Sequence, residues 1–174
     1  MTITTSLSSR CCLALVAALG LGAIGAARAD SGRAMPANMP KSYIEECASC
    51  HTAYPPALLP KRSWQRLMSS LDRHFGVNAS LDEATARQLA SWLQTNGGTY
   101  KRVTEEPPQD RVTRSAWFLR KHREVEPAVW KHASVQSAAN CAACHSKADQ
   151  GDFDDHNLKA PAGLPARMRR TWNH

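Results

Sequence analysis

Apolar residues in the first half of the chain recur at three- and four-residue steps, the period of an amphipathic helix. A short helix is expected over residues 41–50. A second helix is expected to include the residues that keep this period further along, namely Trp64, Leu67, Met68, Leu71, His74 and Phe75. No segment requires a strand, so the pattern predicts a mainly α fold.

Start and stop signals surround a third helix. Ser80 is expected to cap it, with Glu83 completing a capping box, and the glycine pair at 97–98 is expected to end it. In the second half, the pattern predicts a helix over residues 113–125 and a short segment that begins at Pro127. The second half is therefore expected to carry most of its helix early and to end in an Asp/Gly/Pro-rich loop.

The sequence Cys-x-x-Cys-His occurs twice, at residues 47–51 and 141–145. This pattern is typical of covalent haem c attachment. Two thiols three residues apart can reach the two vinyl groups of one porphyrin, and the following histidine can bind the iron. The predicted attachment residues are Cys47, Cys50, Cys141 and Cys144, and the predicted proximal ligands are His51 and His145. The duplication predicts two covalently bound haem c groups.

A zinc site and a thioredoxin-like dithiol are the alternatives. Zinc would gather four thiolates, or three with one imidazole, into one tetrahedral cluster, and would not require histidine after each pair. A thioredoxin-like dithiol follows a strand, and no β-branched strand precedes either motif. Neither alternative explains the duplication.

The N-terminus has the pattern of a secretory signal over residues 1–29. Arg10 is followed by an apolar stretch at 11–27, and residues 27–29 form a small-x-small cleavage site. The apolar stretch is short for a membrane span of about 20 residues, so we expect cleavage and a periplasmic mature chain; a retained anchor is the alternative. Cleavage lowers the net charge from +7 to +5. This charge favours acidic partner surfaces or anionic lipid over nucleic acid.

A Pro/Glu-rich stretch at residues 105–112 separates the two motifs and predicts a linker between two haem-bearing units. Residues 30–104, with a haem helix, a proline loop and a closing helix, resemble a class I cytochrome c. Residues 113–174 are expected to form a small, irregular helical haem domain. Each unit is too small to bury a large core alone, so each is expected to pack around its porphyrin.

The sixth ligand of each iron determines whether the site is closed or can bind small molecules. For the first haem, His74 is favoured because it continues an apolar face and precedes the closing helix. A core histidine bonded to backbone is the competing interpretation. Met68 is the competing ligand, although its neighbours Leu67 and Leu71 favour core packing.

For the second haem, His122 is favoured because it shares a helical face with Phe118, which could pack on the porphyrin. His132 and His156 remain alternatives on either side of the second motif, as does a site with no sixth ligand. His174 is a chain end, where coordination is less expected.

Specific segments in both halves also match one known family. The matching residues are Tyr43 to His51, Tyr54 to Pro60, Ser63-Trp64, Leu67-Met68, His74 to Gly76, Trp117-Phe118 with His122, and Asn140 to His145. With these residues the chain resembles the small periplasmic dihaem cytochromes c called DHC. The resemblance implies bis-histidine coordination of both irons, with His74 and His122 as distal ligands. It also implies two partners, a membrane b-type cytochrome and a small soluble oxygen-binding monohaem cytochrome.

The favoured function is therefore electron transfer without substrate chemistry. The protein is expected to relay single electrons from a membrane-bound, quinol-linked b-type cytochrome to a soluble haem-protein acceptor, and no catalytic residue is expected. A small dihaem peroxidase or a reductase of NO or O2, with one open haem site, is the enzymatic alternative. A gas or redox sensor would need an output module, for which this chain has no room.

Overall fold

A computed structural model describes residues 35–99, 103 and 105–172. The predicted signal at 1–29 and His174 lie outside these residues. The longer helices are α1 (Lys41–Cys47), α2 (Lys61–Met68), α3 (Glu83–Asn96), α4 (Ala116–Lys121) and α5 (Pro127–Trp130). Short 3-10 turns connect them at Pro56–Leu58, Leu71–Arg73, Pro108–Asp110, Val112–Arg114, Cys141–Ala143, Ala148–Gln150, Asp155–Asn157 and Ala166–Trp172. The described part of the chain has isolated bridges but no strand, which confirms a mainly α fold.

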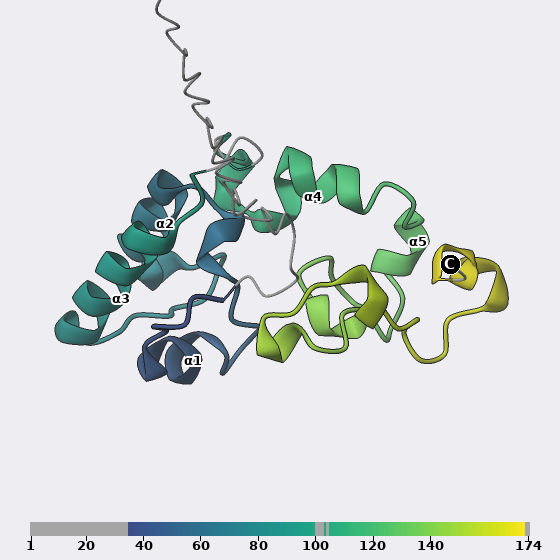
Figure 1. The fold of residues 1–174 in the computed structure, drawn as a ribbon, viewed down its shortest axis with the longest axis horizontal. Helices are drawn as coiled ribbons and strands as arrows, with labels where there is room; N and C mark the ends of the chain where they lie inside the picture. The colour runs from purple at the N-terminus through teal and green to yellow at the C-terminus, as the bar shows by residue number, and fades with distance from the viewer. Residues whose placement is uncertain (1–34, 100–102, 104, 173–174) are drawn as a thin grey trace, which may run out of the picture.

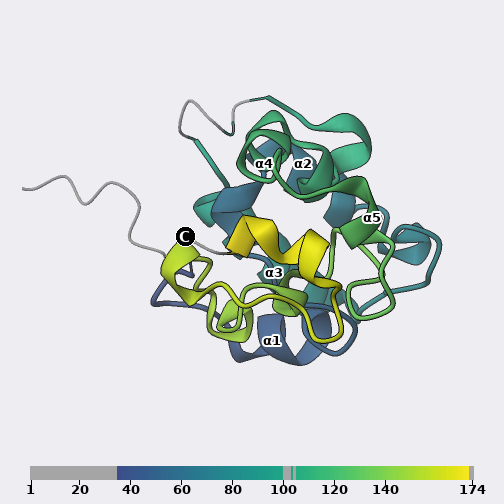
Figure 2. The same ribbon diagram turned by 90° about the vertical axis from the view of Figure 1, so that its right-hand side faces the viewer.

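The helices fall into two groups along the molecule (Figure 1). Helices α1, α2 and α3 lie together on one side, and α4, α5 and the C-terminal segment lie on the other. The view at right angles places α1 at one edge of the molecule and α4 at the opposite edge (Figure 2). None of the helices within the described ranges has the length and apolar character needed to cross a bilayer.

Helix α3 is well defined both at its start and on its buried face. The carboxylate of Asp82 accepts hydrogen bonds from the backbone N–H groups of Ala84 and Thr85, which satisfies two of the free donors at the helix start. The capping box predicted at Ser80 is therefore wrong by two residues. The buried face is made by Leu89, Trp92 and Leu93.

Helix α3 ends at the glycine pair 97–98, as predicted, and the structure shows that this end contacts the proline loop. The N–H of Gly98 donates to the carbonyl of Leu59 over 2.8 Å. A Cβ atom at Gly98 would lie 2.6 Å from Val103 Cγ1 and 2.7 Å from the Ala57 carbonyl oxygen. Only glycine therefore allows this close approach of the two segments.

The helix predicted to run through His74 ends at Met68 instead. The hydroxyls of Ser69 and Ser70 both donate to the carbonyl of Arg66, at 2.9 and 2.8 Å, and compete with the helical hydrogen bonds there. The chain then turns, and Phe75 has a positive φ of 49°. His74 therefore lies in a loop, where periodicity alone placed it on a helix.

Helices at other positions are shorter than the pattern predicts. The first helix ends at Cys47, and the second half has α4 at Ala116–Lys121 in place of a helix over 113–125. The reason at α4 is local, because the Ser115 hydroxyl accepts from the N–H of Phe118 and sets the start of the helix. The short segment that begins at Pro127 is confirmed as α5.

The main apolar cluster joins residues from both sides of the predicted linker. Its buried members are Tyr43, Ala53, Leu59, Trp64, Leu89, Trp92, Leu93, Val112 and Phe118. A second, smaller cluster in the second half contains Val129, Val135 and Leu164. The division into units at 105–112 stays a prediction, and the two halves share part of their core.

Candidate haem-binding sites

The first motif begins where α1 ends. Cys47 is the last residue of the helix, and Cys50 and His51 follow in a turn. The Nδ1 atom of His51 lies 2.7 Å from the carbonyl oxygen of Thr52. A hydrogen bond from Nδ1 to a carbonyl places the proton there and leaves Nε2 free to bind a metal. His51 thus has the tautomer that an axial ligand requires.

The loop after α2 brings His74 to face His51. The two ring centroids are 6.1 Å apart, and the ring planes differ by 22°. Two imidazoles that bind one metal from opposite sides, with metal–nitrogen bonds of about 2 Å, have ring centres about 6 Å apart. The loop is closed at its base by a hydrogen bond of 2.8 Å from the Ala79 N–H to the Leu71 carbonyl. The separation of the rings therefore fits an iron between them.

His74 lacks the hydrogen bond that an ordinary core histidine would make. Its Nδ1 atom is buried and has no hydrogen-bond partner among the described residues. An unpaired buried polar atom costs about 1–3 kcal/mol, which a structural histidine would avoid. Burial, then the neighbouring His51 and Arg111, lowers the pKa of His74 and favours the neutral ring that binds metal.

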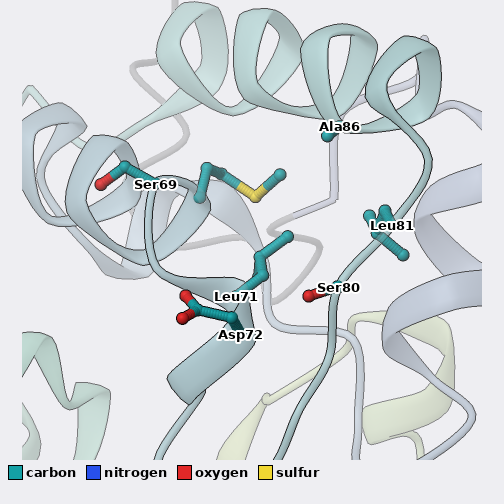
Figure 3. Close-up of a pocket in the computed structure, with 7 residues that line it drawn as sticks. Ser69, Leu71, Asp72, Ser80, Leu81 and Ala86 are labelled. Carbon is teal, nitrogen blue, oxygen red and sulfur yellow. The ribbon is translucent and has the colours of Figure 1, made fainter.

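An open cavity of about 210 Å³ lies at the base of this loop (Figure 3). It is lined by Met68, Ser69, Leu71, Asp72, Ser80, Leu81 and Ala86. Figure 3 shows the labelled lining residues around it, from the end of α2, the loop, the segment just before α3 and the first turn of α3. Met68 also packs against the main apolar cluster, as its neighbours predict.

The second motif lies on a 3-10 turn that begins at Cys141, and His145 follows Cys144 directly. His122 faces His145, with ring centroids 6.2 Å apart and ring planes at 72°. The separation matches that of the first pair, whereas the planes are close to perpendicular. Burial is the main cause that lowers the pKa of both His122 and His145, so both rings favour the neutral form.

Helix α4 positions His122. This residue lies at the C-terminal end of the helix, and its Nδ1 atom is 2.9 Å from the carbonyl oxygen of Phe118. Its ring stacks on that of Phe118, with centroids 4.0 Å apart. Trp130 on α5 packs at 5.8 Å. These contacts fix the ring and its tautomer, with Nε2 left for a metal.

The alternative histidines have other neighbours. The Nδ1 atom of His132 lies 2.8 Å from the Ser134 hydroxyl. The side chain of His156 is 90% exposed and pairs with Asp154 and Asp155. The structure thus brings His122, and neither alternative, to the face of His145.

The thiols do not form a shared metal cluster in the part of the chain that the structure describes. The residues with metal-ligand spacing there are Asp154, Asp155 and His156, without any cysteine. Burial raises the pKa of Cys47 and of Cys141 to about 11. Thiols that stay protonated at neutral pH are poor redox nucleophiles. The arrangement therefore fits two separate haem attachments better than zinc or a dithiol.

Sequence reasoning missed two aromatic residues at the sites. The ring of Tyr54 stacks on His51, with centroids 5.0 Å apart and planes at 25°. Phe153 packs edge-on against His145 at 5.4 Å. The available signal for Tyr54 was its position three residues after the first motif. The signal for Phe153 was that it is an isolated aromatic residue in the polar loop after the second motif.

The comparisons with known proteins all point to one family. The profile of the DHC family, described as dihaem cytochrome c, matches residues 43–153. A diheme cytochrome type c from Shewanella baltica OS155 is 33% identical, with a TM-score of 0.62, over 71% of this chain and 96% of that chain. A diheme cytochrome c from Rhodobacter sphaeroides is 40% identical, with a TM-score of 0.59, over 67% of this chain and 98% of that chain.

A further structure, DHC purified from Rhodobacter sphaeroides, is 42% identical with a TM-score of 0.58, over 66% of this chain and 97% of that chain. No curated protein sequence matches the chain significantly. The family match covers more than half of the sequence, including both Cys-x-x-Cys-His motifs. The chain therefore belongs to the dihaem cytochrome c family and carries two covalently bound haem c groups.

Proposed function

We propose that each iron is held between two histidines, His51 with His74 and His145 with His122. The observation that carries this proposal is the matched separation of the two ring pairs, 6.1 and 6.2 Å. The two cysteines of each motif would hold the porphyrin through thioether bonds. His51 and His122 would each keep the ligating tautomer through a carbonyl partner.

The chemistry that haem c supplies when bound is reversible one-electron exchange at iron. The residues of this chain would restrict it to that exchange, because imidazoles on both faces leave no position for a substrate. Phe118 and Phe153 would keep water from the second pair. Membership of the dihaem cytochrome c family is consistent with electron transfer.

The proposed partners are a membrane-bound, quinol-linked b-type cytochrome as donor and a small soluble monohaem cytochrome as acceptor. Charge supports docking to acidic surfaces. Arg120, Lys121 and Arg123 are exposed around the end of α4, directly beside His122. Exposed basic residues next to a redox centre accelerate association with an acidic partner and make it dependent on ionic strength. The same residues could contact anionic lipid at a membrane surface.

The proposed location is the periplasm. Cytochrome c family members are typically exported, and the pattern at residues 1–29 fits a cleaved signal. N-terminal sequencing of the purified holoprotein tests this directly. A chain that begins at Asp30 supports export with cleavage, and one that retains residue 1 contradicts it.

Carbon monoxide added to the reduced holoprotein tests whether both sites are closed. We expect no change in the optical spectrum, because both axial positions are occupied. Binding of CO at one haem, or a high-spin ferric signal in EPR spectra at neutral pH, would favour the peroxidase or reductase alternative instead.

The ring planes add a sharper test. Near-parallel imidazole planes separate the energies of the two iron d orbitals that overlap with them, whereas near-perpendicular planes leave those energies similar. The planes differ by 22° in the first pair and by 72° in the second. We therefore expect two distinct low-spin EPR signals, a rhombic one from the first haem and a strongly anisotropic one from the second.

A further inference from the structure

Tyr54 contacts the first haem site with its ring and the second with its hydroxyl. The ring stacks on His51, with centroids 5.0 Å apart. The hydroxyl donates a hydrogen bond of 3.0 Å to the carbonyl of Ala139, which lies 85 residues further along the chain. Cys141 Sγ lies 3.7 Å from the same carbonyl oxygen. One side chain thus touches the proximal ring of one site and the backbone that positions the first thiol of the other.

The backbone of Tyr54 is held firmly from the first half. The buried hydroxyl of Tyr43, on α1, donates to the carbonyl of Tyr54. Two buried prolines follow, and the indole Nε1 of Trp64, on α2, donates to the carbonyl of Pro56 over 2.7 Å. Because two helices fix this segment, the ring has little freedom to follow movements of the second half.

The segment that receives the hydroxyl is also ordered, by side-chain hydrogen bonds to backbone. The Ala139 N–H donates to the Ser137 hydroxyl over 3.1 Å, and the Asn140 amide donates to the Val135 carbonyl over 3.0 Å. Ala138 packs against the main apolar cluster. A displacement of the Ala139 carbonyl would therefore move the start of the second motif with it.

We propose that Tyr54 is the positioning residue that fixes the second haem site relative to the first. Its ring orients His51, and its hydroxyl holds the backbone at Ala139 and with it Cys141. This role rests on the proposed two-haem electron-transfer function, and it gives a part in aligning the two centres to a side chain that neither attaches haem nor binds iron.

Tyr54→Phe separates the two contacts, because it keeps the ring and removes the hydroxyl. In the ferric holoprotein, we expect the EPR signal of the second haem to shift or broaden while that of the first stays unchanged. The separation between the two midpoint potentials should change as well. Tyr54→Leu removes both contacts, so both EPR signals should shift.

Thr95→Val is the control. It also removes a hydroxyl that donates to a carbonyl, but this bond to Ser91 lies within α3 and does not involve Tyr54. We expect both EPR signals to remain as in the wild type. The proposal is overturned if Tyr54→Phe leaves the second signal and the potential separation unchanged, or if Thr95→Val alters them as much.

A measurement on the unsubstituted holoprotein covers the case in which a Tyr54 variant does not assemble. In protein labelled with ¹³C at the tyrosine ring carbons, the Tyr54 resonances should move during both reduction steps. Movement in only one step would overturn the proposal. CO binding by the wild type would instead refute the closed-site function, and would leave the Tyr54 contacts to be judged by the variants.

Discussion

An ion pair joins α2 to the linker, and the structure allows its contribution to stability to be estimated; we call this contact of Arg66 the tether. Arg66 binds Asp110 through two hydrogen bonds, at 2.8 Å from Nε and 2.5 Å from Nη2, and also contacts Glu106 at 2.8 Å. The Asp110 side chain is only 14% exposed, whereas that of Arg66 is 48% exposed. We predict that Asp110→Asn weakens this tether without touching either haem site.

The expected loss of unfolding free energy is larger than the loss from removing an ordinary surface ion pair. Exposed ion pairs contribute about 0–1 kcal/mol, and solvent around Arg66 screens part of the attraction. The bidentate geometry and the largely buried carboxylate raise the estimate to about 1–2 kcal/mol. For a chain of this size, such a loss lowers the unfolding midpoint by about 3–6 °C.

The effect should depend on pH in a defined direction. Arg66 lowers the pKa of Asp110 below its usual value. The stabilisation is therefore complete above the pKa of an unfolded aspartate, about 3.9, and is lost as the pH falls through the lower pKa of the folded state. The difference between wild type and Asp110→Asn should shrink below about pH 4 and then disappear.

Thermal unfolding of the holoproteins, followed by circular dichroism between pH 7 and pH 3, measures this difference. Asp72→Asn is the matched control, since Asp72 and Arg73 are 3.8 Å apart with side chains 56% and 79% exposed. We expect the control to unfold with the wild type. Equal midpoints for Asp110→Asn and wild type at pH 7, or a difference that persists unchanged at pH 3, would refute the reasoning.

Two substitutions of proposed iron ligands, with one control, and one substitution in the core are expected to have separable effects. His122→Ala should open the second haem, so that the reduced variant binds CO at one of its two haems, whereas His132→Ala should behave as wild type. His74→Met should raise the midpoint potential of the first haem, on the order of 0.1 V, in a potentiometric titration. Trp64→Phe leaves the Pro56 carbonyl without its indole donor and should cost about 1–3 kcal/mol in denaturant unfolding; an unchanged transition would contradict this.

Local signals predicted those parts of the fold that local chemistry specifies. The period of Leu89, Trp92 and Leu93 and the following glycine pair gave α3 and its end, because a buried helical face and a close backbone approach both constrain residue type. The two Cys-x-x-Cys-His motifs located the haem sites for the same reason, since covalent attachment fixes residue type and spacing.

The loop that carries His74 could not be read from the same pattern. Its apolar residues keep the helical period, and the interruption comes from Ser69 and Ser70, whose hydroxyls bond to the Arg66 carbonyl. Serine is common on helix surfaces, so its presence does not predict a helix end. The sequence nevertheless predicted that His74 faces His51. The segment after α2 brings this side chain to His51 as a loop, where a continued helix was expected to do so.

The hydrophobic periodicity of the sequence does not predict contacts between distant parts of the chain. The hydrogen bond from Tyr54 to Ala139 and that from the Trp117 indole to the Leu58 carbonyl, at 3.3 Å, join segments 85 and 59 residues apart. Each depends on how the two halves dock, and docking follows from total buried surface rather than from any local signal.

Phe118 shows what this docking implies for the two centres. Its buried side chain belongs to the apolar cluster formed mainly by the first half, and the same ring stacks on His122 at 4.0 Å. The residue that faces His145 is therefore supported by the core of the first half. Because a packed core transmits displacement, a change in the packing of α3 should reach the second haem site, even though its own motif lies on the other side of the linker. We therefore expect the geometry of the second site to depend on the packing of the first half through Phe118.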